Sequence, residues 1–475
     1  MGNNLLIISD ICPTTDFTAG IALEKFVKEI STYDDVFFFT ILNPALAHVT
    51  LSQYVKKENS FWTYKPNEYW LTSNIFFELF SLAGDLFSRI ETKLILKNIR
   101  NLIEDHKIDK LVIVLQGQTM YRICAKLRKD HIPYFTITWD SWQWWVLANN
   151  LPRLLRRSLQ KSVNSTYSGG YHFFPTDQMA ISNSVPNNSY SVFTLPSKLT
   201  TFFIRDVEVS PKLFKIAFAG QSYANREIKM FIDFLDRNNW SHQGVPIQLH
   251  VFGRNSLSRN SHIYQYGWLS QEILNSSLAQ MDCAFLPYPL DPNLKFIPDE
   301  SFPSKLSDYL GSKLPIFYLG PSPCSASRIA ELCGVISNES NFESIFFQFI
   351  DRLLEHPDYY LEKVTRVYSD NFSERAFRDS ISFLLPIKKK PEATNVNLKN
   401  SVDKFLLVET TKLRLKFYIS LWFQSVINLF EEYQQSPGRF LARVNAFSKK
   451  IIRSVINRIL GFVISPYVAS KIKRF

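Results

Sequence analysis

Two acidic side chains, Glu300 and Asp308, stand eight positions apart in the segment DESFPSKLSDYLGSKLPIFYLG. Pro303 is typical of the first turn of a helix, so the sequence predicts a helix that begins beside Ser304 and Lys305. Unpaired backbone N–H groups, a hydroxyl and an ammonium would then meet at one point, which favours a diphosphate. Asp308, one turn further along the same face, would accept hydrogen bonds from vicinal hydroxyls such as those of a ribose.

The acidic pair also has an ordinary structural interpretation. Glu300 would be an acid on a surface loop, and Asp308 would cap or solvate a helix. Taken alone, two carboxylates at this spacing favour the structural interpretation. The choice between it and a nucleotide site therefore depends on the surrounding elements.

Short apolar runs alternate with helix-period stretches along most of the chain, which is typical of βαβ units in parallel sheets. The runs of the first series are LLIIS at 5–9, VFFFTIL at 36–42, KLVIVLQ at 110–116 and YFTIT at 134–138. A second series contains KIAFAG at 215–220, IQLHVFG at 247–253, CAFLPY at 283–288 and the strand PIFYLG that follows the acidic segment. We therefore expect an α/β protein with two Rossmann-like domains that face each other across a cleft.

The expected organisation follows from these two series and from the composition of the remaining chain. It comprises a first domain over 1–200, a second domain over 201–385, a polar linker over 386–400 and a basic amphipathic helical tail over 401–475. A length of 475 residues fits more than one domain, and 46% apolar with 20% charged residues fits a globular protein. Ligands are expected at the carboxyl ends of the strands.

The net charge of +11 belongs to the C-terminal region. Residues 386–475 carry 17 Lys and Arg against 5 Asp and Glu, so the two expected domains together are nearly neutral. Aromatic and basic residues at helical spacing in the tail indicate interfacial membrane binding, with a helical hairpin that packs on protein as the alternative. The tail carries no recognised nucleic-acid-binding motif, so we expect no nucleic-acid partner.

Several other chemistries have no support in the sequence. Glycine-rich nucleotide loops, nucleophile elbows, zinc-protease motifs and the DxD metal motif are missing, and we expect neither a metal nor another cofactor. The five cysteines form no CxxC pair, which indicates free structural thiols in a reducing compartment. With no signal peptide and no apolar run of membrane-spanning length, we expect a cytoplasmic protein, free or peripheral at the inner membrane face.

The segment ESFPSKLSDYLGSKLPI resembles the E-x7-E region of GT-B glycosyltransferases, especially family 4-like retaining enzymes with an FPSK variant. The resemblance continues in the correct order over about 215–378, through KIAFAG, IQLHVFG, YQYGWL and NFSERAF. In the first half, SDICPTTDFTAG resembles the loop after the first strand, and TITWDSW resembles a strand end that carries an acidic or His residue.

Carried over by position, the resemblance implies catalytic roles for Glu300, at the donor-sugar hydroxyls, and for Asp140, while Asp308 holds the ribose. The other implied donor-binding residues are Ser304, Lys305, Arg226, Gly220, Gln221, Gly253, Gly267, Trp268 and Leu269. The first-domain loop facing the phosphates would contain Thr18, Ala19 and Gly20. Gln221 stands where the family usually has Arg, and Arg226 matches a family Lys and can still bind a phosphate.

The resemblance implies transfer of a sugar from a nucleotide-diphosphate sugar, with retention and without a metal, to a glycolipid, polysaccharide-precursor or other acceptor. The alternative is a non-catalytic sugar-nucleotide binder or scaffold on the same fold. The cluster WDSWQWW at 139–145 would either stack on a sugar or lipid acceptor or pack in a core.

Overall fold

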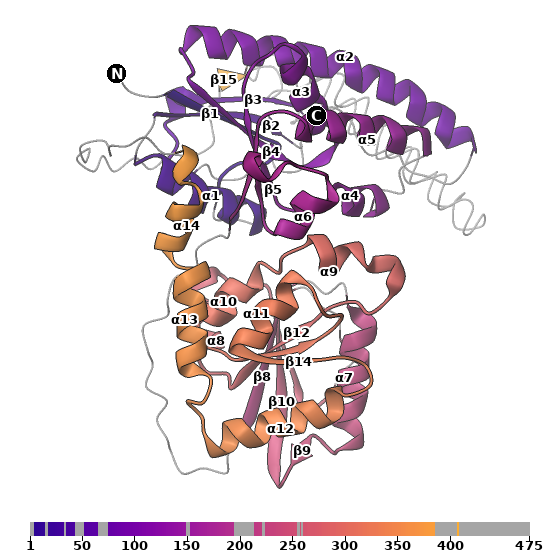
Figure 1. The fold of residues 1–475 in the computed structure, drawn as a ribbon, viewed down its shortest axis with the longest axis vertical. Helices are drawn as coiled ribbons and strands as arrows, with labels where there is room; N and C mark the ends of the chain where they lie inside the picture. The colour runs from indigo at the N-terminus through magenta and orange to yellow at the C-terminus, as the bar shows by residue number, and fades with distance from the viewer. Residues whose placement is uncertain are drawn as a thin grey trace, which may run out of the picture. The chain divides into compact units, whose positions relative to one another are not determined.

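The computed structural model describes residues 4–14, 18–32, 35–42, 52–64, 75–148, 153–193, 213–220, 224–253, 257, 260–384 and 406–407. Residues 1–408 form one compact unit with two mainly parallel β-sheets flanked by helices (Figure 1). This confirms the predicted pair of Rossmann-like α/β domains. The predicted domain boundaries near residues 200 and 385, and nearly all of the predicted tail, lie outside the described residues.

The first sheet has the strand order β15-β3-β2-β1-β4-β5-β6-β7, and all neighbouring strands are parallel. Its strands are β1 (Asn4–Ser9), β2 (Asp35–Leu42), β3 (Ser60–Tyr64), β4 (Lys110–Leu115), β5 (Phe135–Thr138), β6 (Tyr171–Phe174), β7 (Tyr190–Val192) and β15 (Leu406–Leu407). The order reverses between β1 and β4, as in a doubly wound sheet.

Helices cover both faces of the first sheet because strand side chains alternate between the faces. Leu5 and Ile7 of β1 share a core cluster with residues of α1 (Thr18–Ile30) and α14 (Glu374–Ser380). Leu6 and Ile8 share the other cluster with residues of α2 (Ile75–Asp105), α3 (Gly117–Lys129) and α5 (Arg153–Tyr167). Two shorter helices, α4 (Trp142–Ala148) and α6 (Asp177–Ser182), follow β5 and β6.

The second sheet repeats this topology, with the order β11-β10-β8-β12-β13-β14 and a short β9 antiparallel to β10. Its strands are β8 (Phe214–Ala219), β9 (Ser241–His242), β10 (Val245–Phe252), β11 (Ile263–Gly267), β12 (Cys283–Pro287), β13 (Ile316–Leu319) and β14 (Gly334–Ser337). Its helices are α7 (Asn225–Arg237), α8 (Gln271–Leu278), α9 (Phe296–Glu300), α10 (Lys305–Gly311), α11 (Ser325–Cys333), α12 (Phe342–Glu355) and α13 (Leu361–Asn371). The reversal lies between β8 and β12.

The acidic segment differs from the sequence prediction in two details. Glu300 is the last residue of the short helix α9 and does not lie in an open loop. Pro303 precedes α10, which begins at Lys305 with Ser304 as its N-cap residue. A proline carbonyl can still accept the first helical hydrogen bond, and that of Pro303 accepts one from the Leu306 N–H at 2.9 Å.

After α13 the chain returns to the first domain through the segment NFSERAF. Phe377 of α14 packs against Phe26 of α1 with ring centroids 6.5 Å apart. Arg378 donates to the Glu29 carboxylate at 2.7 Å. This segment therefore attaches the end of the second domain to α1 and to the core beneath it.

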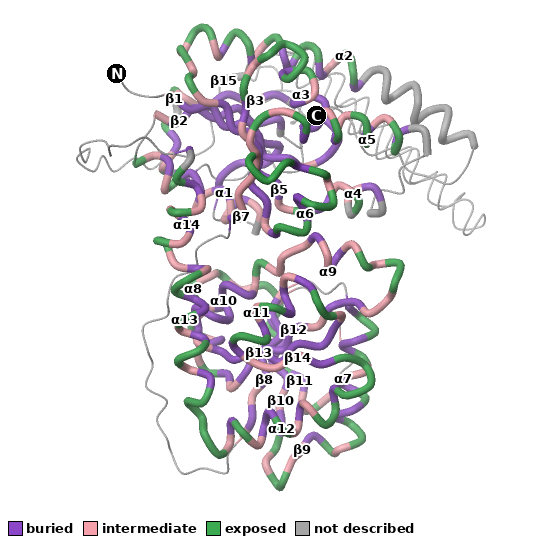
Figure 2. The backbone as a smooth tube through the Cα atoms, in the orientation of Figure 1, coloured by how far each residue is buried: buried purple, intermediate pink, exposed green. Residues whose placement is uncertain are grey.

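The strands form the buried centre of each domain (Figure 2). In the second core, Phe231 of α7 stacks on Phe285 of β12 with ring centroids 4.3 Å apart. All five cysteines are buried free thiols, as predicted. No helix in the described ranges is both long enough and apolar enough to cross a bilayer.

Candidate active site

A pocket of about 430 Å³ lies where the strand order reverses in both sheets. Gln116 follows β4 of the first sheet, and Gly220 and Tyr288 follow β8 and β12 of the second; all three line the pocket. Parallel α/β sheets bind ligands at the carboxyl ends of their strands at such reversals. The fold therefore places this pocket where a ligand would contact both domains.

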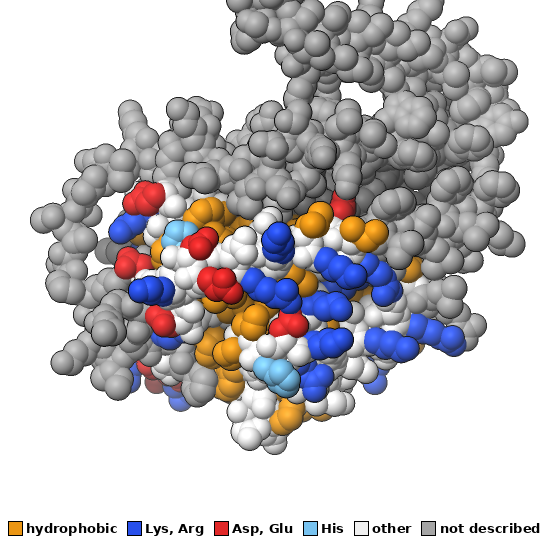
Figure 3. All heavy atoms as spheres, turned by 90° about the horizontal axis from the view of Figure 1, so that it is seen from above, with side chains coloured by type: hydrophobic (Ala, Val, Ile, Leu, Met, Phe, Trp, Pro, Cys, Tyr) orange, Lys and Arg blue, Asp and Glu red, His pale blue; other side chains and the backbone are white. Residues whose placement is uncertain are grey.

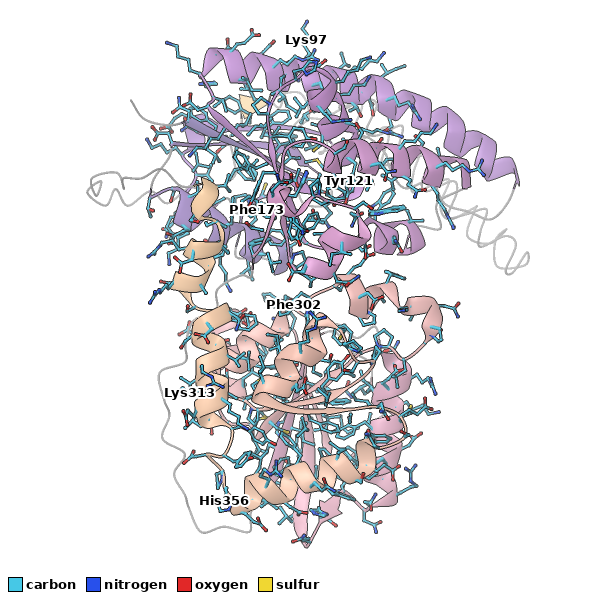
Figure 4. The ribbon with its side chains drawn as sticks, in the orientation of Figure 1. Lys97, Tyr121, Phe173, Phe302, Lys313 and His356 are labelled. Atoms are coloured by element: carbon cyan, nitrogen blue, oxygen red, sulfur yellow. The ribbon has the colours of Figure 1, made fainter. Side chains whose placement is uncertain are left out.

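Residues 301–305, the middle of the segment singled out in the sequence, form one wall of the pocket. Phe302, labelled in Figure 4, stacks against Phe372 with ring centroids 5.9 Å apart. Ser304 and Lys305 contribute a hydroxyl and an ammonium to the same wall. Lys305 is the only cationic residue among those that line the pocket in the described part of the chain.

Two glycines give the second-domain backbone its shape beside the pocket. Gly220 has a φ of 107° and Gly253 a φ of 118°, which only glycine adopts readily. A Cβ on Gly253 would lie 2.8 Å from the carbonyl oxygen of Gly220. The ends of β8 and β10 can therefore approach closely because Gly253 has no side chain.

Tyr309, which also lines the pocket, holds the end of β8 in place through hydrogen bonds. Its buried hydroxyl accepts a 2.6 Å hydrogen bond from the Ala219 N–H and donates to the Ala219 carbonyl at 3.2 Å. Burial raises the pKa of Tyr309 above its ordinary value, so the phenol stays protonated and able to donate. This side chain ties α10 to the end of β8.

Asp308 is buried and already has protein partners. Its Oδ2 is 3.1 Å from the Lys305 ammonium, and its Oδ1 accepts a 2.9 Å hydrogen bond from the Gln271 side chain. Asp308 is not among the residues that line the pocket, whereas Lys305 is. In this structure the carboxylate thus orients the ammonium, and its role at a ribose remains a prediction.

Glu300 also lies outside the pocket lining, because its side chain points to the first domain. It is 3% exposed and interacts with the hydroxyls of Ser141 and Ser182. Burial raises the pKa of Glu300, and those hydroxyls partly offset the increase. In the structure the carboxylate contributes to the contact between α9 and the first domain, and its contact with donor-sugar hydroxyls stays a prediction.

The first-domain wall of the pocket combines helix α1 with the ends of β4 and β5. Ala19 lines the pocket, while Gly20 packs against the loop after β1, where a Cβ would lie 2.3 Å from the Thr14 methyl carbon. Thr18 begins α1, but its side chain is outside the described atoms. The three residues predicted as a phosphate-facing loop are therefore the first turn of α1, and of the three Ala19 lines the pocket.

Asp140 follows β5 and lines the pocket, as predicted for the acid at this strand end. Desolvation by surrounding protein atoms raises its pKa, although the residue keeps one solvent-accessible side. That side leaves the carboxylate open to a ligand in the pocket. Asp140 is then able to accept a hydrogen bond from a ligand hydroxyl.

The other predicted donor-binding residues are spread over the second domain. Arg226 is exposed and forms an ion pair with Glu339. Gly267 is the last residue of β11, and Trp268 and Leu269 follow it, with Trp268 51% exposed. Gly253 packs against the backbone of Gly220 and does not itself line the pocket. Gln221 lies outside the described residues. Within the described ranges no group of three or more His, Cys, Asp or Glu side chains is arranged to hold a metal.

The pocket lining includes Gln116 and Phe372, which the sequence did not single out, whereas Tyr288 ends a predicted strand where a ligand was expected. Gln116 had a usable signal, because it is a polar residue directly after a buried strand in the run KLVIVLQ. Phe372 had none, since an aromatic residue near the end of a helix is usually core.

Comparison with known proteins places this geometry in a fold class. No family model matches the sequence, and a search of curated proteins finds no match. Sucrose-phosphate synthase from Thermosynechococcus elongatus is 9% identical, with 80% of this chain and 98% of that chain covered at a TM-score of 0.55. A structure described as "Trehalose-6-phosphate from E. coli bound with UDP-2-fluoro glucose" is 11% identical, with 82% and 100% covered at 0.53.

A third solved structure is the lipopolysaccharide outer core galactosyltransferase WaaB in its apo form. It is 14% identical to this chain, and the match covers 80% of this chain and 100% of that chain at a TM-score of 0.50. At such identities the likeness shows the fold alone. The chain therefore has the GT-B fold, as the sequence resemblance implied.

Proposed function

We propose that this GT-B protein is a glycosyltransferase that takes a sugar from a nucleotide-diphosphate sugar. The observation that carries the proposal is the placement of Lys305 in a 430 Å³ pocket at the strand reversals of both sheets. A diphosphate needs a cation, and the GT-B architecture brings donor and acceptor domains to one such pocket. The E. coli neighbour is described as bound with UDP-2-fluoro glucose, which supports a donor of this class.

In the proposed reaction, the Lys305 ammonium stabilises the charge that develops on the departing diphosphate, without a metal. Ser304 and the glycine backbone at Gly220 offer hydrogen bonds to the same group. Asp140 faces the pocket from the first domain and orients the acceptor hydroxyl. We propose retention of configuration, following the family that the acidic segment resembles.

The proposed acceptor is a glycolipid or a polysaccharide precursor at the inner face of a membrane. Lys and Arg side chains gather on the exposed face formed by α2, α3 and α5 (Figure 3). The basic residues exposed on these helices include Arg89, Lys93, Lys97, Lys126, Lys129, Arg156, Arg157 and Lys161. Such a face attracts anionic lipid headgroups, which supports membrane association in addition to the basic tail.

A second candidate is a sugar-nucleotide binder without transferase activity. It is favoured by the placement of the two acids, since Asp308 is bonded to Lys305 and Gln271, and Glu300 contacts the first domain. Binding without any turnover would select this candidate.

The deciding experiment combines binding and turnover on the full-length protein. UDP-, GDP- and ADP-sugars are screened by thermal shift, since a ligand of the folded state raises its apparent stability. Each stabilising sugar nucleotide is then tested for hydrolysis and transfer. Absence of both binding and turnover across the panel would show the proposal to be wrong.

The charge of Lys305 has its own matched test. Lys305→Met removes the charge but keeps a side chain of similar length. It should weaken binding of the nucleoside diphosphate about tenfold, because a charge-assisted contact is worth about 1–2 kcal/mol. The corresponding nucleoside should bind with unchanged affinity. Lys229→Met, at an exposed position of α7, is the control and should change neither affinity.

A further inference from the structure

A second cavity, of about 110 Å³, lies entirely within the first domain. Its walls come from the end of β4, the start of α3, the segment after β5 and the helices α4 and α5. Gln116, Trp139 and Asp140 line both this cavity and the larger pocket. A ligand in the smaller cavity would therefore lie directly beside a ligand in the larger one.

Aromatic rings dominate the smaller cavity. Trp139, Trp142 and Trp145 line it together with Tyr121, which Figure 4 labels within the first domain. Trp142 and Trp145 are three residues apart on α4 and so share a helical face. All three tryptophans are only half-buried, so they retain surface that a ligand can cover.

The polar groups of the cavity suit hydroxyls. Among the described residues, the buried Gln116 Oε1 and Trp139 Nε1 atoms have no hydrogen-bond partner. One accepts and the other donates, and Asp140 adds a carboxylate acceptor. An unpaired buried polar atom is unfavourable, so a ligand that satisfies these atoms is favoured over a purely apolar chain.

The charge of the lining restricts the ligand further. None of the described residues that line the cavity is Lys, Arg or His, whereas Asp140 is an acid. A phosphate or carboxylate placed here would have no cation to compensate its desolvation. A neutral molecule with hydroxyl groups and an apolar face is the class that fits all three observations.

We infer that the smaller cavity binds a neutral sugar ring of the acceptor, whose apolar face packs on Trp142 and Trp145 and whose hydroxyls contact Gln116 and Asp140. This inference rests on the proposed transferase function. It adds that the part of the acceptor bound here is an uncharged sugar. The residues shared by the two pockets place one acceptor hydroxyl next to the donor pocket.

Saturation-transfer NMR on the full-length protein tests the inference directly. The probes are methyl glycosides of glucose, galactose, mannose and N-acetylglucosamine, with methyl glucuronide as the charged comparison. At least one neutral glycoside should receive saturation, strongest at ring-face protons, and the glucuronide should bind at least fivefold more weakly. No binding by any neutral glycoside, or a preference for the glucuronide, would overturn the inference.

Matched variants locate the binding. Trp142→Ala and Gln116→Leu should each weaken the glycoside at least fivefold, whereas Trp142→Phe should retain most of the affinity because a flat ring remains. Tyr359→Ala, at an exposed aromatic residue of the second domain, should leave glycoside binding unchanged. If Trp142→Ala and Trp145→Ala, both folded by thermal melting, bind like the unmodified protein, the site is wrong.

Nucleotide binding on the same samples separates this inference from the proposed function. Thermal shifts by UDP, GDP or ADP without any glycoside binding would leave the donor site in place and reject the acceptor site. Glycoside binding at Trp142 without any nucleotide binding or turnover would support a sugar site and reject the transferase proposal.

Discussion

The side-chain amide of Gln271 donates a 2.9 Å hydrogen bond to Oδ1 of Asp308. Gln271 opens α8, directly after the turn at 267–270, whereas Asp308 lies in α10. The residue that follows the turn implied for donor binding and the acid implied for ribose recognition are thus joined by one hydrogen bond. The affinity for a nucleoside that contacts one of these two residues would therefore also depend on the other.

Asp308→Asn tests whether this acid holds a ribose. We expect about tenfold weaker binding of the preferred nucleotide and of its nucleoside alike, because both carry the ribose. Titration calorimetry with both ligands measures this, and Asp233→Asn on the exposed side of α7 is the control. Unchanged nucleoside affinity would mean that the carboxylate serves only Lys305 and Gln271.

Gly253→Ala should destabilise the second domain by about 2–3 kcal/mol, from backbone strain and from the collision with Gly220. Gly244→Ala is the matched control, since Gly244 also has positive φ, 79°, but an added Cβ meets nothing within 4 Å. Urea unfolding of both variants gives the comparison. Equal losses would show that the approach of Gly253 to Gly220 is unimportant.

Glu300→Gln should raise stability at pH 7. Burial raises the pKa of Glu300 in the folded protein, so the folded state holds that proton more tightly than the unfolded chain. Wild-type stability from this group is therefore greatest below its ordinary pKa of 4.5 and falls as pH rises through the raised value. Glutamine is neutral throughout and removes this dependence.

Thermal melting of wild type and Glu300→Gln from pH 4 to pH 8 measures the difference between them. The variant should be more stable near neutrality and nearly equal at the acidic end, with Glu355→Gln, at an exposed position of α12, as the control. A variant that is less stable than wild type at pH 7 would instead indicate that the ionised carboxylate is well solvated or paired in the folded protein.

His172 should oppose folding in acid. It is fully buried with Nδ1 2.7 Å from the Thr136 hydroxyl, and burial lowers its pKa to about 4. The unfolded chain takes up this proton near the ordinary pKa of 6.5, so stability falls as pH decreases from 6.5 to 4. The full effect is about 3 kcal/mol by linkage.

His172→Asn should abolish that acid dependence, measured as the slope of unfolding free energy against pH. His131→Asn is the control, because His131 is exposed and asparagine tolerates its φ of 57°. The effects of Glu300 and His172 have opposite signs between pH 4.5 and 6.5, so each must be read from its variant rather than from the wild-type profile. Identical slopes for wild type and His172→Asn would refute the assignment.

Removal of residues 409–475 should weaken binding to vesicles that contain anionic lipid, because this segment carries much of the excess positive charge. The truncation spares Leu406 and Leu407, which pair with β3. Co-sedimentation at low and high salt measures binding, with neutral vesicles as control. Equal binding with and without the segment would show that the segment is not the vesicle-binding region and would favour the basic face of α2, α3 and α5 instead.

The sequence predicted the strands whose apolar runs are complete, and it missed those without such a run. β11 (Ile263–Gly267) is an edge strand in which four of five residues are exposed, so its sequence IYQYG carries no burial signal. β1, β4, β8 and β12 were all predicted, because central strands are buried on both faces and read as continuous apolar segments. These four strands also border the two reversals at which the pocket forms.

By itself, the sequence determined two parallel α/β domains and the segment that lines the pocket, since both depend on local periodicity and on motifs read over a few residues. Tertiary structure alone decided which side chains meet. It placed Gln116 in the same pocket as Lys305 and joined Gln271 to Asp308. It also directed Glu300 towards Ser141. Such contacts depend on how separate elements pack, and no local pattern of residues encodes that geometry.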